Sequence, residues 1–64
     1  MYYAHDMYGK VHEKNLNKQE AEDFLKSIER LCDVLRCEWE YTTQSEIVVK
    51  VDGKVINIFV MVKS

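Results

Sequence analysis

The pattern of apolar and polar residues near the C-terminus predicts a β-hairpin. Two runs rich in Val and Ile, residues 46–51 and 54–62, flank the dipeptide Asp52-Gly53. A two-residue type I′ turn requires positive φ at both central residues, which Asp tolerates and Gly adopts freely. Such a turn sets the register of the two strands, and it places Val49 opposite Ile56.

This register divides the hairpin side chains between two faces, since the side-chain period of a strand is two. The face expected to form the core is apolar throughout and carries Ile47, Val49, Val51, Ile56, Ile58, Val60 and Val62. The opposite face mixes polar side chains with the apolar Val48, Val55, Phe59 and Met61. A sheet face in water is normally polar, so we expect this outer face to be covered. The cover is the N-terminal segment, a second copy of the chain or a partner protein.

Residues 17–36 carry the pattern of one amphipathic helix. Apolar residues recur every three or four positions, and charged residues fill most of the remaining positions. Asn17 is a favourable N-cap, and Glu20 three positions later completes a capping box. The expected core stripe comprises Ala21, Phe24, Leu25, Ile28, Leu31, Cys32 and Leu35.

The segments on either side of the helix predict further strands. Over residues 37–43 the pattern returns to a two-residue period, with Trp39 on the helix side and Glu38 on the outer side. Residues 1–14 allow two interpretations, a single strand followed by a loop or a hairpin that turns around residues 7–9. The sequence therefore predicts one α+β domain over residues 1–64, in the order β-α-β-β-β. One helix packs on a three- or four-stranded, mainly antiparallel sheet in two layers.

The size and charge of the chain narrow the classes of partner. A domain of 64 residues buries only about 60% of the surface of its unfolded chain, so self-association would add stability. The net charge is −2 and no basic stripe is present, which makes nucleic acid an unlikely partner. A nucleic-acid site would have to combine Lys10, Lys14 and Lys18 with the N-terminal tyrosines. No apolar run approaches the ~20 residues that span a membrane, and no signal peptide is evident. We expect a cytoplasmic protein without a membrane partner.

No residue pattern predicts catalysis, a cofactor or a small-molecule substrate. No serine stands in a glycine-rich loop or a strained turn that would expose a nucleophile. Glu38 and Glu40 share a strand face, but so short a chain offers no evident cleft around them. Metal-binding residue types cluster only at His5, Asp6, His12 and Glu13, and their spacing matches no zinc motif. We expect no metal, and we expect both cysteines, Cys32 and Cys37, to be free and to belong to the core.

These observations predict a small non-enzymatic protein-protein interaction module. It acts as a regulator, inhibitor or adaptor by docking a sheet face or edge onto a partner protein. The expected partner-binding residues are Glu38, Glu40, Glu46, Val48, Val55, Phe59 and Met61. Apolar residues beside acidic ones suit a partner of basic or mixed charge. The alternatives are a structural homodimer with no further partner and, after it, a weak nucleic-acid-binding protein.

Overall fold

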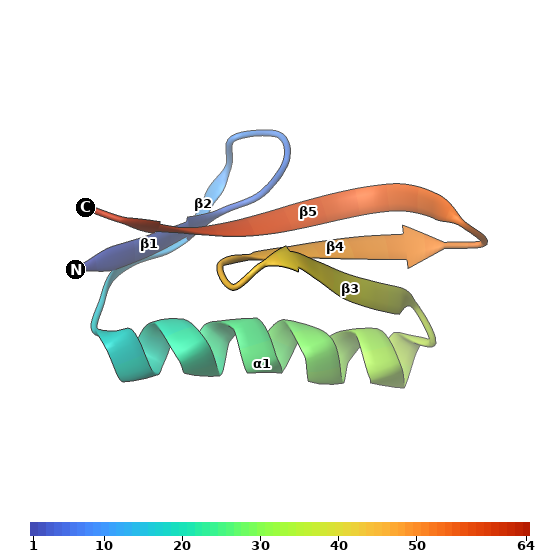
Figure 1. The fold of residues 1–64 in the computed structure, drawn as a ribbon, viewed down its shortest axis with the longest axis horizontal. Helices are drawn as coiled ribbons and strands as arrows, with labels where there is room; N and C mark the ends of the chain where they lie inside the picture. Colours follow the sequence, from blue (N-terminus) through green and yellow to red (C-terminus); the bar gives the residue numbers. More distant parts are fainter.

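The computed structural model describes residues 1–64 as one helix packed on a five-stranded antiparallel sheet (Figure 1). The elements in chain order are β1 (Tyr2–His5), β2 (Val11–Leu16), α1 (Lys18–Leu35), β3 (Glu38–Thr43), β4 (Glu46–Val51) and β5 (Lys54–Lys63). Their order across the sheet is β2-β1-β5-β4-β3. The predicted α+β class, the two layers and the antiparallel sheet are confirmed. The sheet has five strands, however, where three or four were expected.

The additional strand comes from the N-terminal segment, which forms the hairpin β1–β2. β1 pairs with β5, and β2 pairs with the other side of β1. The hairpin therefore widens the sheet, and it does not cover the outer face as one interpretation of the sequence suggested (Figure 1).

The helix begins at the predicted capping box. The Asn17 side chain accepts a hydrogen bond from the Glu20 backbone N–H at 2.8 Å, and the Glu20 carboxylate accepts one from the Asn17 N–H at 2.9 Å. These two bonds satisfy backbone donors that the first helical turn leaves free. At the other end Arg36 adopts the left-handed conformation with φ of 59°, and it stops the helix without a glycine.

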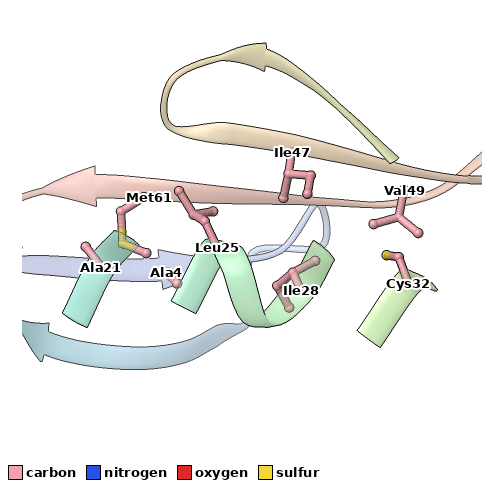
Figure 2. Close-up of a cluster of buried hydrophobic side chains, with 8 residues drawn as sticks. All are labelled: Ala4, Ala21, Leu25, Ile28, Cys32, Ile47, Val49 and Met61. Carbon is pink, nitrogen blue, oxygen red and sulfur yellow. The ribbon is translucent and has the colours of Figure 1, made fainter. Parts of the chain in front are cut away.

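The core lies between α1 and one face of the sheet (Figure 2). Ile47 of β4 is fully buried at its centre. Half of the cluster comes from the helix and half from β1, β4 and β5. Its members are Ala4, Ala21, Leu25, Ile28, Cys32, Ile47, Val49 and Met61.

A β-bulge in β5 decides which side chains of that strand reach the core. Val51 opposes Lys54 as expected, but Val49 opposes Asn57, so Ile56 is an extra residue in β5. One extra residue reverses the facing of every later side chain in the strand. The expected core positions Ile56, Ile58, Val60 and Val62 are therefore wrong, and Phe59 and Met61 pack towards the helix instead.

The last turns of α1 extend beyond the wide part of the sheet (Figure 1). β1 pairs only with residues 60–63 of β5, so the sheet is five strands wide at one end and three at the other. Leu31 and Leu35 were expected in the core, but they are 54% and 63% exposed. The reason is that no strand continues the line of β1 to cover them.

Candidate functional site

The sheet face turned away from α1 carries a continuous band of apolar side chains. Val48 lies opposite Ile58, Tyr3 lies opposite Val62, and Val60 sits between these two pairs on β5. Each of the five is adjacent in its strand to a residue that packs against the helix, so alternation turns it outward. We call these five residues the outer band.

No layer of the protein covers the outer band. The only helix lies on the opposite face, and the N-terminal hairpin extends the sheet, with Tyr3 of β1 as its part of the band (Figure 1). Val48 is 6% exposed and stands on β4 between Glu40 of β3 and Ile58 of β5. The other four side chains are half-buried, so the band presents a closely packed apolar surface to solvent.

Carboxylates flank the outer band on its β3 and β4 side. Glu38 and Glu40 lie opposite Lys50 and Val48, and Glu46 lies on the same face. Lys50 Nζ is 2.7 Å from Glu40 Oε1, and this hydrogen bond is the main cause that raises the pKa of Lys50. We call Glu38, Glu40 and Glu46 the acidic rim. Since Lys50 is the only cation paired with it, the rim keeps a net negative charge.

The seven residues that were expected to bind a partner do not all lie on one surface of the structure. Glu38, Glu40, Glu46 and Val48 come together on the outer face. Val55 is exposed near the hairpin turn, beside the bulge and opposite Lys50. It lies outside the outer band.

Phe59 and Met61 do not lie on the outer face, so their expected placement there is wrong. Met61 is 7% exposed and belongs to the core. Phe59 is half-buried on the helix side, where its ring centroid lies 6.3 Å from that of Phe24. The bulge at Ile56 is the physical reason for both changes.

The residues that sequence reasoning missed on the outer face are Tyr3, Ile58, Val60 and Val62. β5 is apolar at both odd and even positions, so alternation alone cannot assign its faces. Because Asn57 is polar, the sequence led us to expect it on the outer face, and this expectation was wrong. Its side chain in fact accepts hydrogen bonds from the Ile58 and Met7 backbone N–H groups, at 2.8 and 3.3 Å.

Asp6 organises the loop between β1 and β2. Its buried carboxylate accepts hydrogen bonds from the backbone N–H groups of Tyr8 at 2.9 Å and Lys10 at 3.0 Å. His12 Nε2 donates to the second oxygen at 2.8 Å, and this bond is the main cause that lowers the pKa of Asp6. His5 lies on the other face of the sheet, so the two histidines do not converge. No three His, Cys, Asp or Glu side chains are grouped closely enough to hold a metal ion.

We expect Asp6→Asn to reduce the acid sensitivity of the fold. An aspartate whose folded pKa lies below its ordinary value of 3.8 stabilises the fold above that value, and the stability is lost as pH falls through the folded pKa. The urea concentration at the unfolding midpoint of the wild type should therefore decrease when the pH is lowered below about 4. The midpoint of Asp6→Asn should be lower than that of the wild type at pH 7 and should change less with acid. Asp23→Asn on the exposed helix surface is the control, and equal acid slopes for Asp6→Asn and wild type would contradict the assignment.

Two of the surface hollows combine acidic and basic side chains, Lys18 and Glu22 in one and His12, Glu13 and Lys14 in the other. The largest, of about 480 Å³, is lined by Tyr41, Thr42, Thr43 and Gln44 at the turn between β3 and β4. Its one ionisable group is the Tyr41 phenol, whose pKa is raised by burial and by its hydrogen bond to Glu29.

Both cysteines are free, and neither lies in a hollow that could receive a substrate. Cys32 is buried in the core, and burial raises the pKa of its thiol, which disfavours the reactive thiolate. Cys37 is half-buried and packs against the same core.

The one helix is not long and apolar enough to cross a membrane. Comparison of the chain with protein-family models, with curated proteins and with solved structures found no match.

Proposed function

We propose that this protein is a small non-enzymatic interaction module that docks its outer sheet face onto another protein in the cytoplasm. Binding there makes it a regulator, inhibitor or adaptor of that partner. The observation that carries the proposal is the outer band, an apolar sheet face without a covering layer. Contiguous exposed apolar surface is typical of interaction sites in soluble proteins.

The charges around the band specify the chemistry of the partner. Glu38 lies opposite Lys50, which is ion-paired with Glu40, and Glu46 has no ion pair. A partner surface with an apolar centre and Lys or Arg on one flank complements this arrangement. Complementary charge speeds association and excludes acidic competitors, while the apolar centre supplies most of the affinity.

A homodimer is the second candidate, and a different surface favours it. Exposed apolar side chains gather at the C-terminal end of α1 and at the tip of the β4–β5 hairpin. They are Leu31, Val34, Leu35, Val51, Val55 and Ile56. Only ten of the 64 residues are buried, so a second copy at this end would add apolar burial that the monomer lacks.

Two lysine substitutions distinguish these candidates. Val60→Lys places a charge in the outer band opposite Glu46, and Val34→Lys places one on the exposed end of α1. We expect Val60→Lys to weaken retention of a specific protein from a lysate about tenfold or more, equivalent to about 1.4 kcal/mol. Val34→Lys should retain that protein like the wild type.

Circular dichroism must first show that both variants are folded. Equal retention by Val60→Lys and wild type would refute docking through the outer band. Sedimentation equilibrium of the same samples addresses the dimer: a wild-type dimer that only Val34→Lys dissociates would favour the second candidate.

A further inference from the structure

The sheet has two outer strands, and only one of them, β2, is irregular. The pairing of β2 with β1 shifts register twice, and Asn15 in β2 has a left-handed φ of 60°. β3 pairs with β4 without a shift from Glu38 to Tyr41. Proteins protect exposed edges with bulges, Pro or charged side chains. β3 has no bulge or Pro over that stretch, and its only charges are the carboxylates of Glu38 and Glu40, which repel an acidic strand and attract a basic one. Its free side therefore presents a regular row of backbone donors and acceptors.

Below this edge, on the helix side, two aromatic side chains are held in fixed positions. Trp39 Nε1 donates to Asp33 Oδ1 at 2.9 Å, and the Tyr41 hydroxyl donates to the Glu29 carboxylate. The two rings meet edge to face with centroids 5.9 Å apart. Tyr41 remains 39% exposed. Because their polar atoms already have partners, the rings offer apolar surface to the side chains of an added strand.

The charges around the edge favour a positively charged occupant. Glu38 and Glu40 lie on the outer face of β3, and Glu29 and Asp33 lie on the helix side. Lys50 is the only cation in an ion pair with any of these four carboxylates. A second copy of β3 would bring like charges together on neighbouring strands, which is destabilising.

We propose that the β3 edge binds an extended basic segment of another protein as a sixth strand of the sheet. Lys or Arg side chains on one face of that segment lie beside Glu38 and Glu40. Apolar side chains on its other face lie on Trp39 and Tyr41. Backbone hydrogen bonds provide affinity in this binding mode, and the alternating side chains provide specificity. The proposal concerns the edge alone and holds whether or not the outer band docks a protein.

A synthetic peptide tests the proposal on the full chain. The probe is an eight-residue peptide that alternates Lys and Val, with both ends blocked, and the control peptide alternates Glu and Val. Hydrogen exchange of the ¹⁵N-labelled protein is followed by NMR. We expect the Lys-Val peptide to slow exchange at alternate β3 amides, about tenfold when the free peptide is at about ten times its Kd. The Glu-Val peptide should leave these amides unchanged.

Charge variants separate strand addition from general attraction to an acidic protein. The double substitution Glu38→Lys and Glu40→Lys should reverse the preference, so that the Glu-Val peptide protects β3. Glu13→Lys on the opposite edge strand is the matched control and should behave like the wild type. If the double variant does not fold, Glu38→Gln should weaken Lys-Val binding about two- to fivefold, as expected for one exposed ion pair.

Three results would overturn the proposal. The first is the absence of protection at β3 with the Lys-Val peptide, and the second is protection confined to the outer band. The third is β3 protection that rises with protein concentration in the absence of peptide, since a second copy would then occupy the edge.

Discussion

Replacement of Ile47 with alanine is expected to lower the free energy of unfolding by about 3–4 kcal/mol, within the range of about 2–5 kcal/mol for such changes in buried cores. Ile47 is 0% exposed and lies at the centre of the core (Figure 2). Removing all of its side-chain carbons beyond Cβ loses apolar burial and leaves a cavity between α1 and β4. A domain of this length has about 3–10 kcal/mol of stability, so much of it would be lost.

Urea unfolding followed by circular dichroism measures this effect. Val51→Ala is the matched control because Val51 is on the same strand but exposed, and it should cost about 1 kcal/mol or less. Similar losses for the two variants would mean that Ile47 is not the centre of the core.

Aspartate substitutions at the adjacent positions 61 and 62 of β5 are expected to have opposite effects on folding. Met61→Asp must bury a carboxylate against α1, so this variant should be unfolded at neutral pH. Val62→Asp places the carboxylate on the outer face, and we expect it to fold with a loss of about 1–2 kcal/mol. Far-ultraviolet circular dichroism and one-dimensional NMR of both variants show whether each of them is folded.

The neighbouring positions serve as controls for each other, because the substitution and the strand are the same. A folded Met61→Asp together with an unfolded Val62→Asp would show that β5 faces the helix in the opposite sense. It would also show that Ile56 does not form a bulge.

The parts of the fold that the sequence predicts correctly are governed by local interactions. The capping box depends on Asn17 and Glu20, three residues apart, and the helix follows from the spacing of its apolar residues. The turn of the β4–β5 hairpin depends on Asp52 and Gly53, which adopt φ of 52° and 77° as a type I′ turn requires. Each of these features can be read within a few residues of the chain.

The facing of β5 is determined by contacts across the whole molecule. Both sets of alternate side chains in β5 are apolar, so the choice depends on which set packs better against the helix. The structure selects Phe59 and Met61, which reach Phe24 and the core cluster, and the bulge makes this possible. No turn residue or polar position in the strand specifies the bulge.

The same distinction between local and long-range contacts separates the site residues that could be predicted from those that could not. The placement of Glu38 and Glu40 on the outer face was predictable, because β3 alternates cleanly between carboxylates and aromatic rings. The apolar centre of the site was not, because it lies on β5 beyond the bulge. The N-terminal hairpin was one of two open interpretations, since its loop is held by the Asp6 carboxylate and carries no strong turn sequence.

The bulge also has a consequence at the level of the gene. Loss of the single codon for Ile56 would remove the bulge and leave Asn57 opposite Val49 and Ile58 opposite Val48, so both faces of β5 would be kept. An in-frame deletion or insertion after the bulge, with the bulge kept, would instead exchange the faces, and the surface offered to a partner would then carry Phe59 and Met61 in place of Val60 and Val62. Such a deletion or insertion is thus a one-step evolutionary route to a new binding surface, without a substitution at any surface position.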